Sequence, residues 1–555
     1  MNMRKCISII LLLLLTSVLM LGCNKQTNTK ENEEITESKL VNGKYDPPVT
    51  ITTGRGLNTG DVKFKNDEDI HNNVHNKWAK EALGIEIKYD WIVADEGDQF
   101  NNKIRLSLSA NEPLPDVMLI GDRQLASDLI ESGLVQPIDE AIEKYATPRI
   151  KKLFEDFPQG FATSTVDGKR YGIPRYSGGN GSDSVLWIRQ DWLDKLNLKG
   201  PETLEDVEKI MDAFVHQDPD GNGKDDTIGV TLAMKYNLAT WMADGSWIFG
   251  AYGDYLPKHW SLGDDGKLVY GSIQPSIKQG LAKLNEWFEK GYLDREVGIL
   301  DEEKAIESFV AGKSGIAAAP PWAADWPLPD LLQNNPEAVI KAYPMPSGPD
   351  GNIGRKGEGY LTGAFLFNKD FKHLDAFFKY YDAIYGYLLG ESEYFENGMH
   401  EGYDYVMKDG KPVYDKDEIP GGWVNPGKYN LLGDIPDAPF LMYDLLKQFH
   451  RKEKKPETAY ENILVARGDL WLESAAIITD QNEHRIENLF TGPPTKTQQS
   501  KGEFLDKMQM KVFSEIVYGK APLSDFDKFV EEWKAGGGDK ITEEVNEWYK
   551  SVNGE

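Results

Sequence analysis

The loop from Asp218 to Asp226 has the residue pattern in this chain that is best suited to binding a metal ion. With Asp218 as position 1, oxygen-bearing side chains stand at positions 1, 3, 5 and 9, and Gly223 stands at position 6. The ligand candidates are the side chains of Asp218, Asp220, Asn222 and Asp226 and the backbone carbonyl of Lys224. A calcium ion takes about six to eight oxygen ligands, and alternate residues of a tight loop can direct them at one centre. The spacing therefore predicts a calcium loop at residues 218–227.

The end of this loop departs from the calcium-binding pattern. An EF-hand has a bidentate glutamate at position 12, where this chain has Gly229. Asp226, helped by Asp225 or Thr227, must then close the coordination shell. The alternative is an ordinary polar surface turn, because Asp, Asn and Gly are the residues of which turns are made.

The N-terminus has the pattern of a bacterial secretion signal. The basic residues Arg4 and Lys5 precede an apolar run from Ile7 to Leu21, which is too short for a comfortable membrane span. Gly22-Cys23 then ends the run and resembles a lipobox, so we expect a signal peptide at 1–22, a lipid on Cys23 and a disordered tether at 23–44. The alternative is an ordinary signal peptide in which Cys23 is incidental.

The composition limits the classes of partner. Cys6 leaves with the signal peptide and Cys23 is the one remaining thiol, so no disulfide is expected in the folded body. With 90 Asp and Glu against 62 Lys and Arg, the net charge is −28, which disfavours nucleic acid as a partner. The 14 Trp and 25 Tyr suit ligands that present apolar ring faces, such as sugars.

The first third of the folded body predicts an α/β sheet. Strands are expected at 49–53, 85–89 and 115–121, with helices at 71–83, 100–108 and 125–132 between and after them. This β-α-β-α-β order predicts a mostly parallel sheet. Ligands of such sheets bind outside the carboxyl ends of the strands, which here are followed by Gly54–Gly56 and Gly121–Arg123.

Several segments further along resemble one family. They are YGIPRY (171–176), WIRQDWLDKLNL (187–198), PETLEDV (201–207), KGYLD (290–294), FVAGKSGI (309–316) and the tail from Glu515 to Tyr549. In number and order, they resemble the extracellular solute-binding lipoproteins of bacterial ABC carbohydrate importers, in the large Gram-positive branch that is related to alginate-oligosaccharide binding proteins.

The resemblance implies a two-lobed, type II periplasmic-binding-protein fold with hinge strands and a central ligand cleft. One lobe would hold residues 45–175 and 319–368, and the other 185–315 and 370–555. It implies a monomeric, lipid-anchored receptor on the extracellular face of the cell membrane that delivers a carbohydrate to ABC permease subunits. It also places the calcium loop away from the cleft, with Thr227 in place of an acidic ligand.

The cleft candidates are aromatic and charged residues near the predicted crossings and strand ends. Aromatic faces pack on sugar rings, and charged groups hydrogen-bond to hydroxyls. The candidates are Arg55, Asp122, Arg123, Arg175, Trp247, Trp322, Trp326, Tyr360 and Trp423. For each aromatic residue, the alternative is a place in the core.

Two other functions remain open from the sequence. A secreted glycoside hydrolase needs only two suitably spaced carboxylates, although no catalytic motif marks such a pair here. A sensor or adhesion lipoprotein would use the same fold and differ only in its partner.

Overall fold

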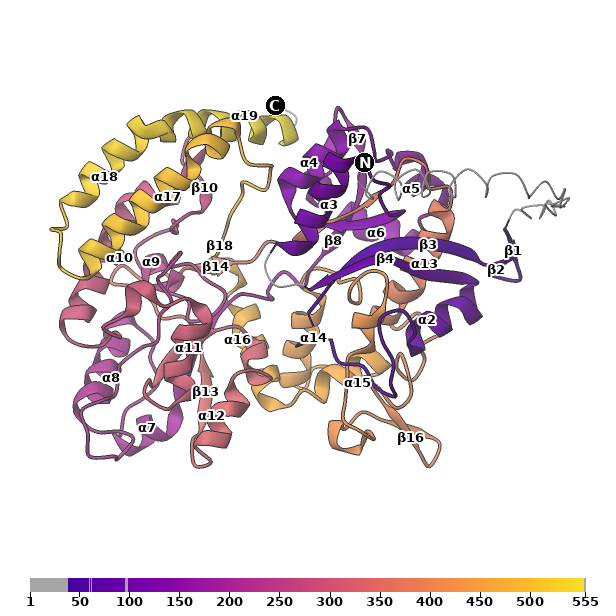
Figure 1. The fold of residues 1–555 in the computed structure, drawn as a ribbon. Coiled ribbons are helices and arrows are strands. Elements are labelled where there is room, and N and C mark those ends of the chain that lie inside the picture. The colour runs from indigo at the N-terminus through magenta and orange to yellow at the C-terminus, as the bar shows by residue number, and fades with distance from the viewer. Residues whose placement is uncertain (1–37, 59, 61, 95–97, 554–555) are drawn as a thin grey trace, which may run out of the picture.

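The computed structural model describes residues 38–58, 60, 62–94 and 98–553. The expected signal peptide, Cys23 and most of the expected tether lie outside the described residues. Figure 1 shows two lobes, each with its own sheet and helices. None of the described helices is long and apolar enough to span a membrane.

The first lobe is built on a five-stranded sheet with the order β4-β3-β5-β15-β8. The strands are β3 (Val49–Leu57), β4 (Ile85–Ala94), β5 (Val117–Ile120), β8 (Gly172–Tyr176) and β15 (Leu361–Phe367). β3 runs parallel to β4 and β5, and β15 runs antiparallel to β5 and β8. The predicted parallel pairing of the first three strands is therefore confirmed, and the later strand β15 makes the sheet mixed.

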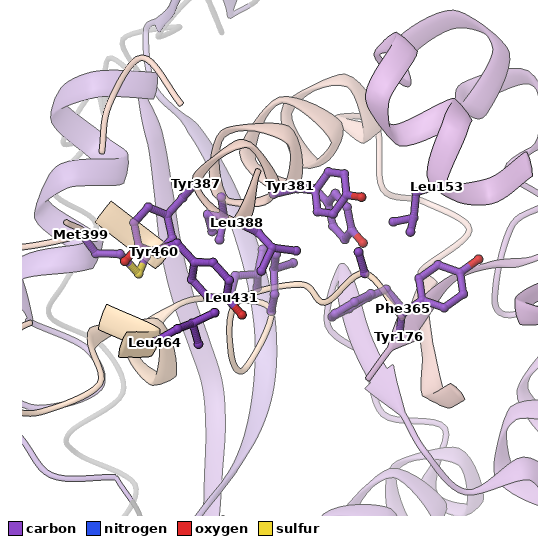
Figure 2. Packing of buried hydrophobic residues seen from close by; sticks show 14 of the residues in the cluster. Leu153, Tyr176, Phe365, Tyr381, Tyr387, Leu388, Met399, Leu431, Tyr460 and Leu464 are labelled. Atoms are coloured by element: carbon purple, nitrogen blue, oxygen red, sulfur yellow. The ribbon is translucent and has the colours of Figure 1, made fainter. Parts of the chain in front are cut away.

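The three helices expected in the first third of the folded body are present in this lobe, together with others that were not predicted from the sequence. Between and after the first strands come α2 (Val74–Trp78), α3 (Gln99–Ala110) and α4 (Arg123–Glu131). The others are α5 (Asp139–Tyr145), α6 (Pro148–Asp156), α13 (Leu374–Leu388), α14 (Leu441–His450), α15 (Ala459–Val465) and α16 (Asp469–Asp480). α13 is buried along nearly its whole length, as expected for a helix that is apolar on all sides. In Figure 2, Tyr381 and Tyr387 of this helix lie among side chains from β15, α6 and α15.

The second lobe contains a three-stranded sheet with the order β12-β9-β13. Both β12 (Ile316–Ala319) and β13 (Ile340–Tyr343) are antiparallel to β9 (Val185–Arg189). The helices are α7 (Gln190–Lys195), α8 (Leu204–His216), α9 (Ser246–Gly250), α10 (Pro275–Glu289), α11 (Glu302–Val310), α12 (Leu328–Asn334), α17 (Lys496–Val517), α18 (Asp525–Trp533) and α19 (Asp539–Asn553). Thr203 begins α8 with a capping box completed by Asp206, and the apolar face of that helix packs on the core.

Short elements complete both lobes. The strands are β6 (Thr165–Val166), β7 (Lys169–Arg170), β10 (Trp260–Leu262), β11 (Leu268–Tyr270), β14 (Arg355–Gly357), β16 (Val406–Lys408), β17 (Lys411–Val413) and β18 (Arg485–Glu487). The 3-10 turns are η2 (Pro158–Phe161), η3 (Gly271–Ile273), η4 (Val297–Ile299), η5 (Pro321–Ala324), η6 (Lys416–Glu418), η7 (Pro426–Tyr429) and η8 (Asn482–His484), and η1 (Ala79–Leu83) and η9 (Lys534–Gly538) are π-helical.

The chain passes between the sheets at places that differ in part from those expected. β8 leads to β9 through residues 177–184, as expected for the first crossing. However, residues 319–343 continue in the second lobe, because β13 pairs with β9. Residues 374–465 lie in the first lobe, where α13 shares a core with β15, and α16 packs between α14 and the second-lobe elements β13 and η5. The other crossings are therefore near 344–360 and 481–488, and β14 and β18 pair there in parallel.

A hairpin occupies the end of the expected tether. β1 (Lys39–Val41) and β2 (Lys44–Asp46) pair antiparallel around Asn42-Gly43, and both turn residues have positive φ. Asn-Gly is the sequence most favoured in a two-residue hairpin turn, because both residues tolerate this conformation. The expectation of disorder up to residue 44 is therefore wrong for residues 39–44.

Candidate functional site

A cavity of about 980 Å³ opens where the first crossing meets η5 and the helices α14 to α16. Gly178, Gly181 and Ser182 of the crossing line it, and Arg175 contributes from the end of β8. Trp322 and Asp325 line it from the second lobe. A molecule in this cavity would therefore contact both lobes and the segment that joins them.

The aromatic wall of the cavity is formed by indole rings. Trp322 lines the cavity, and its Nε1 donates to the carbonyl of Gly181 at 2.6 Å. Trp241 and Trp326 lie beside it, with ring centroids 5.8 Å and 6.4 Å from that of Trp322. Trp423 lines another part of the wall, and the Lys416 ammonium lies 5.6 Å from its ring centroid. Such rings suit the C–H faces of sugars.

Asp325 organises the polar side of the cavity. Its Oδ2 accepts from Trp471 Nε1 at 2.9 Å, and its carboxylate lies 3.4 Å from Lys416 and 4.0 Å from Arg467. The Arg467 guanidinium also lies over the Trp471 ring, at 4.6 Å from its centroid. These contacts fix several donors and one carboxylate on the cavity wall.

Two other carboxyl groups of the cavity are less acidic than usual. Burial raises the pKa of Asp437 to about 7, and the neighbouring Asp434 adds to this rise while Arg175 and Arg467 oppose it. Burial also raises the pKa of Glu358, although Lys356 opposes the rise. Glu358 Oε2 accepts from the backbone N–H of Ser182 at 2.7 Å, so this carboxyl group is attached to the first crossing.

A buried ionic cluster ties the three crossings together directly behind the cavity. Asp183 contacts Arg355, and its Oδ2 lies 2.8 Å from Arg485 Nε. Although burial disfavours the charged form, the two guanidinium groups lower the pKa of Asp183. The backbone N–H of Glu358 also donates to this carboxylate at 2.6 Å. One acidic side chain thus joins residues of all three crossings.

The predicted calcium loop follows α8 in the second lobe, and none of its residues lines the cavity. Asn222 Nδ2 donates to Asp220 at 2.6 Å and to Asp226 at 3.0 Å. Gly223, with φ of 74°, donates its N–H to Asp218 Oδ2 at 3.1 Å. The Asn222 amide therefore lies between the carboxylates of Asp220 and Asp226, and Gly223 makes the predicted turn.

The loop fits a hard cation in two respects. Asp218 Oδ1 is buried without a hydrogen-bond partner, and burial together with the neighbouring carboxylates of Asp218 and Asp226 raises the pKa of Asp220. Thr227, in contrast, donates its hydroxyl to Phe214 O at 2.7 Å and points away from the loop. Within the described part of the chain, no group of three or more His, Cys, Asp or Glu side chains is arranged as a metal site, so a cation would also need the Asn222 oxygen.

Comparison with known proteins places the chain in a family. The sequence pattern of bacterial extracellular solute-binding proteins matches residues 65–380. The chain belongs to this family. Solute-binding proteins of ABC transporters are receptors and not enzymes, so the family does not support the hydrolase alternative.

Similar proteins extend this result to most of the chain. Lipoprotein LipO of Bacillus subtilis (strain 168) is 23% identical over 486 residues, which cover 86% of this chain and 88% of that protein. The polygalacturonan/rhamnogalacturonan-binding protein YtcQ of the same strain is 26% identical over 472 residues, which cover 81% and 83%. Both similarities extend well beyond residues 65–380.

Solved structures confirm the fold. The Streptococcus pneumoniae substrate-binding protein FusA, in complex with kestose, has a TM-score of 0.63 at 19% identity and covers 91% of this chain and 100% of its own. The alginate-binding protein AlgQ2, solved without calcium ion, has a TM-score of 0.59 at 18% identity and covers 91% and 98%. The α/β solute-binding fold expected from the sequence is thus confirmed.

The structure brings three predicted ligand residues of this solute-binding protein to the cavity wall, namely Arg175, Trp322 and Trp423. Trp326 lies beside Trp322 and is 44% exposed. Tyr360 instead packs against Phe157 and Tyr176 and donates to Gln159 at 3.0 Å. Tyr360 lies next to the cavity because it directly precedes β15, which begins at Leu361.

The other predicted residues have structural contacts. Trp247 is fully buried and donates to Asp244 O at 2.9 Å, so it belongs to the core of the second lobe and not to a ligand site. Arg55 donates to three backbone carbonyls between residues 428 and 433. Asp122 caps α4 and pairs with Arg105 at 2.6 Å, and Arg123 donates to Phe490 O at 3.0 Å in the other lobe.

Sequence reasoning missed several residues of the wall. Trp241, two residues before the turn Ala243-Asp244-Gly245, is half-buried and stacks on Trp322 beside the cavity wall, whereas Trp247 after the turn is buried. Asp325 stands between two predicted tryptophans, and Arg467 precedes Trp471 by four residues. Arg467 lies in the turn between α15 and α16, so helical spacing does not account for its contact with Trp471.

Proposed function

We propose that this extracellular solute-binding protein captures an oligosaccharide in the cavity between its lobes and delivers it to an ABC importer. The observation that carries the proposal is a cavity of about 980 Å³ in which indole rings and charged groups from both lobes face one space. FusA in complex with kestose and the polysaccharide-binding relative YtcQ support a carbohydrate as the ligand. A ligand that touches both lobes stabilises the arrangement that the membrane subunits recognise.

The experiment is a thermal-shift screen of oligosaccharides against the purified protein, followed by calorimetry. Fructo-oligosaccharides, oligogalacturonates and alginate oligosaccharides form the panel. A true ligand raises the melting temperature by an amount that grows with the logarithm of its concentration over its Kd, because it binds only the folded state. Product analysis after long incubation should find intact sugar. A panel without any shift would contradict the proposal, and cleaved sugar would favour the hydrolase alternative.

We infer that the protein is held at the extracellular face of the membrane by a lipid on Cys23. Support comes from the sequence of the first 23 residues and from the similarity to lipoprotein LipO. Metabolic labelling with a radioactive fatty acid should mark the wild type and not Cys23→Ser, and the variant should appear in the medium. A monomeric state stays a prediction that light scattering after size exclusion checks.

We also propose that the loop at 218–227 holds calcium as a structural ion. Its support is the arrangement of Asp218, Asp220, Asn222 and Asp226 and the unpartnered oxygen of Asp218. The ion would neutralise carboxylates that repel one another and fix the end of α8. It would take no part in ligand binding, because the loop lies apart from the cavity.

A further inference from the structure

The charged side chains of the cavity wall differ in whether the protein gives them a hydrogen-bond partner. Among the described residues, nine charged side chains line the cavity, of which five are Lys or Arg and four are Asp or Glu. The acidic groups already accept hydrogen bonds from the protein. Asp325 accepts from Trp471, Glu358 from Ser182, Asp434 from Ile435 and Asp437 from the backbone of Gly178.

Arg175 differs from these groups. Within the part of the chain that the structure describes, its guanidinium makes no hydrogen bond and no ion pair, although it lines the cavity. Burial lowers the pKa of Arg175, and the positive charge of Arg55 lowers it further while Asp434 and Asp437 act in the opposite direction. The protein has therefore partly desolvated a cation and has not given it a bonded partner.

The surroundings of Arg175 reinforce this imbalance. Arg175 also borders a neighbouring hollow of about 390 Å³, which Arg55 lines as well. The Arg55 guanidinium is bonded only to uncharged backbone carbonyls, at 3.2 to 3.3 Å. Among the described residues, the two guanidinium groups thus approach one space without a carboxylate bonded to either, although Asp98, which pairs with Arg105, lines the same hollow. Lys63 lines the cavity too, and among the described residues it has no ion pair.

A carboxylate is the group that such a guanidinium binds best. Its two oxygens match two parallel N–H donors, and a charge-assisted pair in a partly desolvated place is stronger than a bond to a neutral hydroxyl. A neutral sugar would offer Arg175 only hydroxyl oxygens. An acidic sugar would also relieve the repulsion between Arg175 and Arg55.

We propose that the ligand is an acidic oligosaccharide and that Arg175 binds the carboxylate of one of its uronate units. This proposal rests on the function proposed above and narrows its substrate class. The aromatic wall binds ring faces of acidic and neutral sugars alike. Selection between them therefore falls to Arg175, with Lys63 as a second cation at the same cavity.

The test compares a trigalacturonate with its fully methyl-esterified form in calorimetry. The two probes share ring, linkage and length and differ at the carboxyl group, which is a charged carboxylate in one and a neutral methyl ester in the other. We expect the wild type to bind the acid at least about tenfold more tightly, as one charge-assisted pair implies. Arg175→Gln should reduce this ratio to near one, and Arg175→Lys should retain part of it. Rising salt concentration should weaken binding of the acid and leave the affinity for the ester unchanged.

Lys152→Gln is the matched control, because Lys152 is an exposed cation of the same lobe that does not line the cavity. It should keep the wild-type ratio. Equal affinity for acid and ester, or a ratio that Arg175→Gln leaves unchanged, would overturn this inference. Binding of neutral sugars alone would overturn it and leave the proposed function intact, whereas no binding by any sugar of the panel would overturn both.

Discussion

Trp322 links the ligand cavity to the hinge, because its ring lines the cavity and its Nε1 is bonded to Gly181 of the first crossing. We expect Trp322→Ala to weaken oligosaccharide binding by about 2 kcal/mol, the loss typical of a central aromatic contact. Trp322→Phe should lose less, since it keeps a ring. Calorimetry measures both. Trp247→Phe is the control, and it should lower the melting temperature without changing affinity; an unchanged Kd in Trp322→Ala would remove this residue from the site.

Asp437 makes binding of an acidic sugar dependent on pH. Burial first, and then Asp434, raises its pKa to about 7, so it is mostly protonated at about pH 6 and mostly ionised at about pH 8. A bound carboxylate raises this pKa further, so the complex holds more protons than the free protein. Affinity for trigalacturonate should therefore fall as pH rises through 7. Calorimetry at several pH values should show this slope in the wild type and not in Asp437→Asn, and a slope that survives in the variant would assign it to another group.

At the residue scale, sequence patterns found part of the site. Arg175, Trp322 and Trp423 were identified from their place near strand ends and glycines. The same reasoning placed Trp247 in the site, because flanking glycine was taken as a sign of an exposed loop. In the structure, Gly245 precedes the short helix α9, and α9 directs Trp247 into the core. Which of two nearby tryptophans faces a cavity depends on tertiary packing that spacing does not contain.

At the scale of elements, the calcium loop should stabilise the second lobe. Chelation with EGTA should lower the melting temperature, and calcium should restore it, because the ion binds the folded loop and not the unfolded chain. Asp220→Ala should abolish the effect of calcium, whereas Asp265→Ala, at an exposed acid of the same lobe, should keep it. Sugar affinity measured well below the melting temperature should not change. A loss of affinity before any loss of stability would place the loop in the ligand site.

We expect mutation of the ionic cluster at the crossings to lower the free energy of unfolding more than mutation of any surface ion pair. Asp183→Asn leaves Arg355 buried without a counter-charge and leaves Arg485 with Glu487 alone, for which a cost of about 3–5 kcal/mol is expected. Asp480→Asn is the matched control, because Asp480 contacts two cations, Lys447 and Arg451, at the surface and should cost less than about 1 kcal/mol. Urea denaturation measures both, and equal losses would show that the cluster is not essential.

The order of strands and helices could be predicted where the apolar periodicity is strong. The packing of segments that are far apart in the sequence could not. The strands at 49–53 and 85–89 and their parallel pairing follow from alternating apolar residues. The return of the chain to the first lobe after β15 depends on α13, whose apolar surface shares a core with β15. The hairpin at residues 39–46 had a usable signal in Asn42-Gly43, which the polar composition around it concealed.

At the scale of the whole molecule, two contacts between the lobes bear on ligand binding, besides the packing of α16 on β13 and η5. One is the cavity wall, where Trp322 of the second lobe meets the first crossing. The other is a contact at the start of α4, where Arg123 reaches the carbonyls of Phe490 and Gly492 and Gln124 accepts from Gln499 at 2.7 Å. The second contact joins the lobes without forming part of the cavity.

This second contact predicts a mutation that changes binding without touching the ligand. Separation of the lobes breaks the bonds of Arg123, so Arg123→Ala should favour the open arrangement and weaken every ligand by the same factor, about tenfold. The ratio between trigalacturonate and its methyl ester should stay at the wild-type value, and small-angle scattering of the ligand-free variant should show a larger radius of gyration. Arg105→Ala removes an equal charge nearby but contacts only the first lobe, so it should leave both measurements unchanged. A changed ratio in Arg123→Ala would instead place Arg123 in direct contact with the sugar.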